Sequence, residues 1–266
     1  MRKPILTLTT DFGLADHYVG AMKGVILGIC PGAHLVDISH QVRPFDIEEG
    51  AFLIAQAYRS FPAGTVHVVV VDPGVGSARR PILLEAAKQY FVAPDNGVLA
   101  MVYAREKHRV RCISNQRYFR HPVSRTFHGR DIFAPVAARL AAGVAPARMG
   151  KSIADYVRPP FEQPRQTGAR TWAGRVLTVD RFGNVVTNFH VDRFPDLEKL
   201  TIGRAKVRVL RQTYAEAPPG ELFAIAGSSG YLEVSMNQGS AAEKIACQSG
   251  AAVVLTAPAD GRLARS

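Results

Sequence analysis

The segment His67–Arg80 (HVVVVDPGVGSARR) constrains the fold of this chain more than any other. Four consecutive valines are typical of a strand covered on both faces, as in an α/β protein whose sheet is largely parallel. Ligands of such proteins bind beyond the carboxyl ends of the strands, where Asp72 is expected to lie. Arg79 follows a glycine-rich turn and is able to fold back towards Asp72. An Asp that caps its own turn, followed by surface arginines, explains the segment alone equally well.

The rest of the chain shows two different patterns. Residues 1–165 alternate strand and helix signals, with strands expected at Ile5–Thr10, Leu35–Ser39, His67–Val71, Ile82–Ala86 and Tyr90–Val92 and helices at Asp16–Cys30, Asp46–Ser60 and Asp131–Ala142. A proline-rich stretch between Tyr156 and Gln166 is typical of a linker. Short strands with turn signals follow. The sequence therefore predicts an N-terminal α/β domain (1–165) and a smaller C-terminal β-barrel domain (166–266).

Composition limits the class of protein. The 266 residues carry a net charge of +11, and basic residues concentrate between Arg105 and Arg130. A nucleic-acid-binding face is one interpretation, but the segment has no Lys/Arg block, so a solvated basic face is favoured. No apolar run is long enough for a membrane span, and the N-terminus does not read as a signal peptide. Three widely spaced cysteines suggest no zinc site. We expect a cytoplasmic enzyme without a metal, a membrane or a nucleic-acid partner.

Two N-terminal motifs follow or precede expected elements. Asp11 ends the first strand and would share a sheet edge with Asp72 if the two strands are neighbours. A carboxylate there suits a ribose diol, although a local turn is the simpler explanation. His128 precedes a helix for which Asp131 is the expected N-cap, and a histidine can relay protons near neutral pH. A lone His at that point is more often structural, but Asp72, Arg79 and His128 together are able to position and activate water.

Two turns of the C-terminal half also carry polar side chains. Asp180–Asn184 (DRFGN) predicts a hairpin turn with Gly183 and Asn184 at positive φ. Asp180 also suits an ammonium group and Asn184 an adenine edge. The hydroxyls and amides of Gly227–Tyr231 (GSSGY) suit a carboxylate. A plain turn explains each motif taken singly.

In their order along the chain, these motifs resemble the S-adenosyl-L-methionine hydroxide adenosyltransferases, the hydrolytic relatives of fluorinases and chlorinases. The resemblance rests on TTDFG, VDPGVGSARR, APDNG, FHGRD, DRFGNVVTN and SSGYLEV. It implies an N-terminal α/β domain, a C-terminal β barrel and a homotrimer with active sites between subunits. The implied reaction cleaves S-adenosylmethionine (SAM) with water into adenosine and methionine. SAM is then the substrate, and no cofactor is implied.

The resemblance also implies a role for particular residues. The catalytic trio is Asp72, Arg79 and His128, with Asp72 also counted among the substrate-binding residues. The other substrate contacts are Asp11 and Phe45 for the ribose, Asp180, Ser228 and Ser229 for the methionine, and Phe182, Asn184, Met236 and Gln238 for adenine, with Glu233 nearby. Halogenases lack the trio, carry an extra loop after the segment that contains Arg79, and have Ser and Arg where this chain has Ser228 and Ser229. Halide chemistry is therefore disfavoured.

The sequence supports a mechanistic hypothesis and leaves alternatives open. His128 and Asp72 would orient water and accept its proton, while Arg79 would stabilise developing hydroxide. Which residue is the base, and which epimer of SAM is used, stay open. A methyltransferase is a weaker alternative, because DPGVG lacks a third spaced glycine and follows the third strand. A non-enzymatic basic RNA-binding protein is the other.

Overall fold

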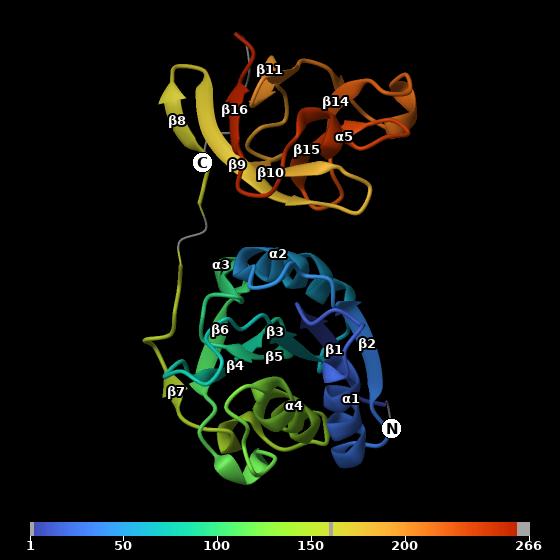
Figure 1. Cartoon of the computed structure of the whole chain (residues 1–266). Helices are drawn as coiled ribbons and strands as arrows, with labels where there is room; N and C mark the ends of the chain where they lie inside the picture. Colours follow the sequence, from blue (N-terminus) through green and yellow to red (C-terminus); the bar gives the residue numbers. More distant parts are fainter. Residues whose placement is uncertain (1–2, 160–161, 260–266) are drawn as a thin grey trace. The chain divides into compact units, whose positions relative to one another are not determined.

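The structure is a computed structural model that describes residues 3–159 and 162–259. The chain divides into two compact units, residues 1–160 and 161–266 (Figure 1). The predicted linker between Tyr156 and Gln166 spans this division, and residues 160 and 161 lie outside the described part. Each unit has its own sheet and its own core.

The N-terminal unit is built on a mixed seven-stranded sheet in the order β2-β1-β3-β5-β4-β6-β7. Parallel pairing joins β2 (His34–Ser39), β1 (Ile5–Thr10), β3 (Val66–Val70) and β5 (Gln89–Pro94). Antiparallel pairing then joins β5 to β4 (Pro81–Ala86), β4 to β6 (His108–Cys112), and β6 to β7 (Ser152–Ile153). The prediction of a largely parallel sheet therefore holds for one half of it only.

A two-residue turn explains why the other half is antiparallel. Ala87 and Lys88 join β4 to β5 with φ values of 52° and 59°. Positive φ at both central residues matches the tight hairpin turns that fit the twist of paired strands. This turn sends β5 back along β4, so no crossover helix is needed between them.

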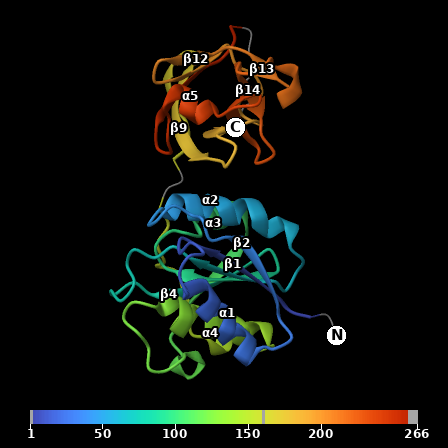
Figure 2. The same cartoon turned by 45° about the vertical axis from the view of Figure 1, so that its right-hand side comes forward.

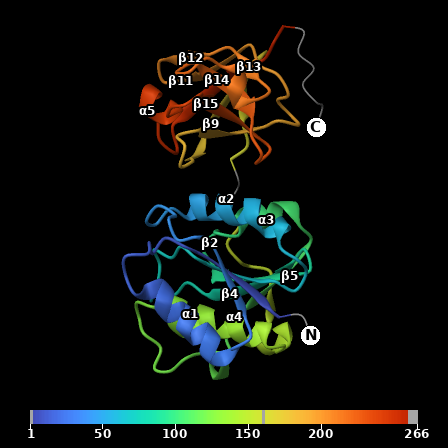
Figure 3. The same ribbon diagram turned by 90° about the vertical axis from the view of Figure 1, so that its right-hand side faces the viewer.

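Helices cover both faces of this sheet, as Figures 1 and 3 show. On one face lie α1 (Tyr18–Ile29) and α4 (Ala134–Ala141), and on the other lie α2 (Ile47–Ala57) and α3 (Ala100–Arg105). The side chains of β3 and of Val71 after it alternate between the two cores, with Val66, Val68 and Val70 in one and Val69 and Val71 in the other. The valine run is thus buried on both faces, as the sequence predicted.

The expected cap at Asp131 is absent, whereas Asp46, the expected first residue of a helix, forms a cap. Asp46 caps α2, because its side chain accepts a hydrogen bond from the Glu49 amide at 2.9 Å. The expectation for Asp131 is wrong, because a π-helical turn over Gly129–Phe133 extends the helix towards its N-terminus. Asp131 is instead fully buried inside that turn. Burial opposes its charge, but hydrogen bonds from Arg130, the Ser124 amide and Arg120 prevail and lower the pKa of Asp131.

The C-terminal unit is a nine-stranded sheet that curls into a half-barrel (Figure 2). Its strands are β8 (Arg165–Gly168), β9 (Thr171–Val179), β10 (Val185–His190), β11 (Lys199–Ile202), β12 (Ala205–Val207), β13 (Leu210–Arg211), β14 (Leu222–Ala226), β15 (Tyr231–Met236) and β16 (Ala252–Thr256). One short helix, α5 (Ala241–Ile245), follows β15. Pairings in the described part run along an open path from β12 to β13, so a closed barrel stays a prediction.

No helix within the described ranges is long and apolar enough to cross a membrane.

Candidate active site

The N-terminal half-site lies just beyond the carboxyl end of β3. Arg79 folds back so that its Nε donates to Asp72 Oδ1 at 3.0 Å, while its Nη2 donates to Asp72 Oδ2. The same Nη2 lies 2.8 Å from His128 Nδ1. The side chains of Arg79 and Asp72 are only 9% and 5% exposed. The structure thus brings the three predicted catalytic residues together, with the guanidinium between the other two.

The glycine-rich turn makes this fold-back possible. The Val75 amide donates to the Asp72 carbonyl at 3.2 Å, and the Ser77 amide donates to the Gly74 carbonyl at 3.1 Å. Gly76 has a φ of +77°, and a Cβ there would lie 2.3 Å from the Arg125 carbonyl oxygen. Only glycine fits such a position. The chain therefore reverses direction twice between Asp72 and Arg79, which brings the Arg79 side chain back to Asp72.

The contacts of the trio define its protonation. Burial and the positive charge of Arg79 lower the pKa of His128, so its ring is neutral at pH 7. Because a guanidinium can only donate, Nδ1 is the accepting nitrogen and Nε2 carries the proton. Nη1 of Arg79 is buried and has no hydrogen-bond partner in the described part of the chain. Arg79 Nη1 is thus the donor of the trio that no other described group uses, whereas the His128 ring also has a backbone hydrogen bond with Ser124.

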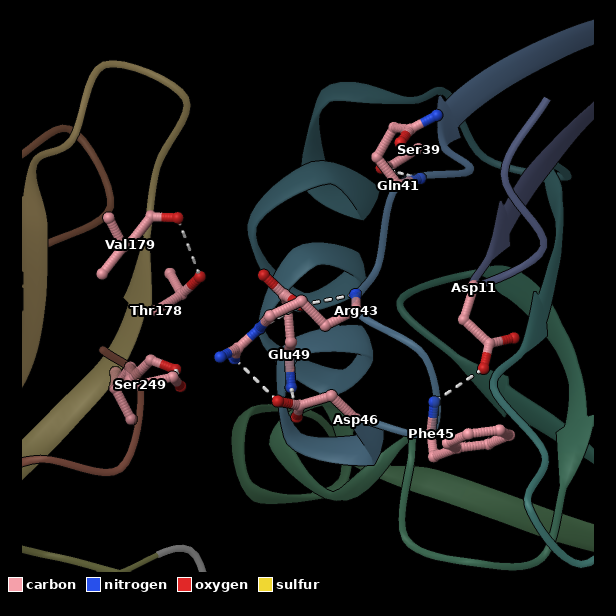
Figure 4. A network of polar contacts seen from close by, with 11 residues as sticks. Asp11, Ser39, Gln41, Arg43, Phe45, Asp46, Glu49, Thr178, Val179 and Ser249 are labelled. Atoms are coloured by element: carbon pink, nitrogen blue, oxygen red, sulfur yellow. Dashed lines mark hydrogen bonds and ion pairs between the residues drawn. The ribbon is translucent and has the colours of Figure 1, made fainter. Parts of the chain in front are cut away.

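Asp11 and Phe45 lie beside this trio. Strands β1 and β3 are parallel neighbours with Thr10 opposite Val70, so Asp11 and Asp72 follow adjacent strands as predicted. Burial and the nearby charge of Asp72 raise the pKa of Asp11. Asp11 Oδ2 accepts a hydrogen bond from the Phe45 amide at 2.9 Å (Figure 4).

Phe45 occupies an unusual backbone conformation. Its φ is 69°, which bulky residues rarely adopt, and the residue is 70% exposed. On its two sides, Arg43 binds Glu49 and Asp46, and Asp46 caps α2 (Figure 4). These contacts hold the strained residue in place. The aromatic ring is therefore presented to solvent next to the Asp11 carboxylate.

The C-terminal half-site is a pocket of about 700 Å³. Its lining residues are Asp180, Phe182, Asn184, Tyr214, Ser228, Glu233, Met236, Asn237, Gln238 and Gly239. The structure thus gathers every predicted C-terminal site residue except Ser229, which is not part of the lining. Tyr214, Asn237 and Gly239 were not predicted. Asn237 and Gly239 flank a predicted residue, whereas no local pattern marks Tyr214.

The carboxylate of Asp180 is used mainly within its own turn. Oδ1 accepts hydrogen bonds from the Phe182 and Asn184 amides, both at 2.9 Å, and Oδ2 accepts one from Asn184 Nδ2 at 2.8 Å. Gly183 has a φ of 81°, whereas Asn184 has no positive φ, contrary to the prediction. One left-handed residue suffices because the Asp180 side chain closes the turn.

Glu233 is the less engaged carboxylate of the pocket. It is 7% exposed, and burial together with the charge of Asp180 raises its pKa. Its Oε2 receives a long hydrogen bond from the Tyr214 hydroxyl at 3.4 Å. Gly227 makes room for it, since a Cβ there would lie 1.8 Å from Glu233 Oε1. Two acidic side chains in one pocket favour a cationic group.

No cluster of three or more His, Cys, Asp or Glu side chains suited to a metal ion occurs among residues 3–159 and 162–259.

Fold and site together define a class: a two-unit protein with an Asp–Arg–His trio beyond parallel strands and an acidic pocket on a curled β-sheet. The sequence matches the SAM hydroxide adenosyltransferase N-terminal domain over residues 6–150 and the corresponding C-terminal domain over residues 174–254. The chain belongs to the SAM hydroxide adenosyltransferase family.

Individual relatives agree with this family. A protein from Salinispora arenicola named (R)-S-adenosyl-L-methionine hydrolase is 40% identical over 96% of this chain and 98% of its own length. A fluorinase from Nocardia brasiliensis is 31% identical over 91% and 93% of the two chains. The solved structure of an uncharacterized conserved protein from Thermotoga maritima has a TM-score of 0.87 at 38% identity, covering 95% of this chain and 99% of that one.

Proposed function

We propose that the chain is a hydrolase that cleaves SAM at C5′ with water, giving adenosine and L-methionine. The observation that carries the proposal is the contact of Arg79 with both Asp72 and His128, next to Asp11 at the same sheet edge. The family and the hydrolase relatives support it. The name of those relatives, (R)-S-adenosyl-L-methionine hydrolase, further favours the (R) sulfonium epimer as substrate.

The chemistry fits what the trio offers. A sulfonium is already a good leaving group, so the site needs only to place an oxygen nucleophile in line with the C5′–S bond. The O–C5′ bond forms as the C5′–S bond breaks, sulfur keeps the electron pair and becomes a neutral thioether, and the proton of water passes to solvent. Arg79 Nη1, a buried donor without a partner in the described part of the chain, would stabilise the developing hydroxide.

The contacts with Arg79 bear on the hypothesis that His128 and Asp72 accept the proton of the attacking water. Both Asp72 oxygens and His128 Nδ1 already accept hydrogen bonds from Arg79. His128 Nδ1 has a single lone pair and would have to give up this bond before it could take a proton, and protonation of Asp72 would weaken its ion pair with Arg79. We therefore assign the trio primarily to binding and orienting the nucleophile as hydroxide forms.

The remaining contacts are assigned to the two half-sites. Asp11 and Phe45 would hold the ribose, and Asp180 with Glu233 would face the methionine ammonium. Ser228 and Ser229 would meet the carboxylate, and adenine would lie among Phe182, Asn184, Met236 and Gln238. Because these groups belong to separate compact units, we propose that half-sites of neighbouring subunits combine in a homotrimer in the cytoplasm.

The basic segment supports nucleic-acid binding poorly. Arg120 and Arg130 both pair with the buried Asp131, and Arg111 pairs with Glu85. Two carboxylates thus offset part of the positive charge of the segment, which leaves less for a phosphate backbone.

Product analysis tests the proposal. The purified protein is incubated with the (R) and (S) epimers of SAM, separately, with chloride and without a methyl acceptor. Adenosine plus methionine from the (R) epimer, lost in His128→Ala, is the expected result. 5′-Chloroadenosine would instead indicate a halogenase and S-adenosylhomocysteine a methyltransferase. Unchanged substrate would contradict an enzymatic function, and salt-dependent RNA binding would then be measured.

A further inference from the structure

A second set of polar side chains adjoins the turn that carries Asp11 and is separate from the Asp72–Arg79–His128 trio. His40 follows β2 and is only 4% exposed. Its Nδ1 lies 2.8 Å from Thr10 Oγ1, and its Nε2 lies 3.0 Å from Asp37 Oδ1. Asp37 also accepts a hydrogen bond from Lys23 Nζ at 2.6 Å. The contacts run from α1 across β2 to the last residue of β1.

The partners of His40 fix the direction of these hydrogen bonds. Asp37 Oδ1 faces Nε2 at 3.0 Å as an ion-pair contact outside hydrogen-bond geometry, and because a carboxylate can only accept, Nε2 carries the ring proton. In the neutral ring, Nδ1 is then an acceptor for the Thr10 hydroxyl proton. The Thr10 oxygen keeps a lone pair for the Phe12 amide, which donates to it at 3.3 Å. The ring orientation set by Asp37 therefore determines how Thr10 holds the residue after Asp11.

The backbone of His40 holds the same turn from its other end. Its carbonyl accepts a hydrogen bond from the Gly13 amide at 2.8 Å. Phe12 and Gly13, the two residues that follow Asp11, are thus both tied to His40, one through Thr10 and one directly. The segment from His40 also leads to Phe45, whose amide binds the Asp11 carboxylate. One residue consequently links both elements that we assign to the ribose.

We propose that His40 is a positioning residue for substrate binding: through Thr10 it sets the turn that carries Asp11 and hence the place of the carboxylate that meets the ribose. This inference rests on the proposed function, because it takes Asp11 as the ribose ligand. Asp37 and Lys23 serve by fixing the imidazole ring. The residue does not touch the reacting atoms, so its loss is expected to weaken binding more than the chemical step.

The fold provides a matched control in His67. Its Nδ1 lies 2.7 Å from Thr7 Oγ1, and its Nε2 lies 3.2 Å from Gln89 Oε1. It is fully buried and contacts the same strand, β1, through the same kind of hydroxyl. Thr7, however, lies inside the strand and not at the turn of Asp11. A substitution at His67 therefore reproduces the loss of a buried Thr–His contact without acting on that turn.

Two substitutions at His40 separate its two contacts. The amide of Asn ends near the place of Nδ1, so His40→Asn keeps a partner for Thr10 and loses Asp37. The amide of Gln ends near the place of Nε2, so His40→Gln keeps Asp37 and loses Thr10. We expect His40→Gln to raise KM for SAM and the adenosine dissociation constant by about tenfold, with kcat within about threefold. His40→Asn should retain more of the affinity. His67→Asn should lower the melting temperature and leave KM unchanged.

Further measurements keep the inference falsifiable. Hydrogen exchange of residues 10–14, followed by mass spectrometry, should rise in His40→Gln and not in His67→Asn, with or without ligand. Where His40→Gln does not fold, Thr10→Val and Thr10→Ser pose the same question, since only Ser retains the hydroxyl. An active wild type with unchanged KM in His40→Gln or Thr10→Val would overturn the inference. Equal KM changes in the His40 and His67 variants would do so too. A wild type that releases no adenosine would contradict the proposed function instead.

Discussion

The two units hold their candidate site residues in different ways. In the N-terminal unit, Arg79 already binds Asp72 and His128, so the polar groups are fixed before any substrate arrives. In the C-terminal unit, the residues surround an open space of about 700 Å³, and the Glu233 carboxylate receives a long hydrogen bond from the Tyr214 hydroxyl. Donors that are fixed in advance stabilise the charge that develops in the transition state, whereas an open pocket binds the parts of a substrate that do not react. Variants of the Asp72–Arg79–His128 trio should affect kcat, and variants of the C-terminal pocket should affect KM.

The largest expected effect is on the trio. Arg79→Ala removes the guanidinium, so Asp72 and His128 lose the buried donor that they share. We expect kcat for adenosine formation to fall by about 10²–10³-fold with little change in KM. The adjacent Arg80→Ala is the matched control, because Arg80 binds Asp95 and Asp155 and should affect stability only. Equal losses in kcat and affinity would break the comparison between the units.

The next effect concerns acid stability of the N-terminal unit. Burial lowers the pKa of His67 to about 4 from its ordinary value of 6.5. The unfolded chain therefore takes up a proton at this residue below pH 6.5, and the folded chain does so only near pH 4. Stability is full above pH 6.5 and falls by about 3 kcal/mol as the pH drops to 4.

Chemical unfolding at several pH values measures this effect. His67→Gln, which does not titrate, should show a flatter pH dependence of the free energy of unfolding than the wild type. The fluorescence of Trp172, the chain's single tryptophan, reports unfolding of the C-terminal unit and serves as an internal comparison. That unit contains one histidine, His190, which is partly exposed, so this pH dependence is not expected there. Identical pH dependence in wild type and His67→Gln would contradict the assignment.

A smaller effect is expected in the C-terminal pocket. Glu233→Gln removes a buried carboxylate that we assign to the methionine ammonium, so KM for SAM should rise about tenfold with kcat nearly unchanged. Because burial and the charge of Asp180 raise the pKa of Glu233, wild-type KM should increase on acidification at a higher pH than an ordinary glutamate would cause. This part of the pH profile should be absent in Glu233→Gln. The exposed Glu243→Gln, on α5, serves as the charge-matched control.

The smallest effect compares one helix cap from each unit. Asp46 accepts from the Glu49 amide at 2.9 Å beside Phe45, and Ser240 Oγ accepts from the Glu243 amide at 3.1 Å beside Gly183. Asp46→Ala and Ser240→Ala should each lower the free energy of unfolding by about 1 kcal/mol. Denaturant titration measures both. A loss of kcat in either variant would show that the adjoining half-site depends on its helix.

Local sequence signals predicted the parts of the fold whose causes are local. The valine run gave β3, and Asp46 with an acidic first turn gave the start of α2. The antiparallel edge was missed because the turn at Ala87 and Lys88 lacks the Gly or Asn typical of such hairpins. Helix α3 was missed because no side chain caps its start at Leu99.

The candidate site was predictable only in part for the same reason. The return of Arg79 to Asp72 follows from a short glycine-rich turn, so the residues themselves suggested it. The contact between Arg79 and His128 joins distant segments, so their residue types suggested a common role, and only the family resemblance implied that they meet. Tyr214 comes from a connection without a motif, and its place in the pocket depends on how distant strands pack. The prediction that Asp131 caps a helix was wrong because its carboxylate is buried and accepts hydrogen bonds from Arg120 and Arg130.

The turn at Gly76 restricts the sequences that can occupy this position. Any side chain there would meet the Arg125 carbonyl, and the left-handed backbone excludes β-branched residues independently. Relief by shifting the backbone would carry Arg79 away from both of its partners. In a saturation library at position 76, we therefore expect every substitution to displace the Arg79 guanidinium and to reduce activity. The tolerance of position 76 to substitution thus reports on the placement of Arg79.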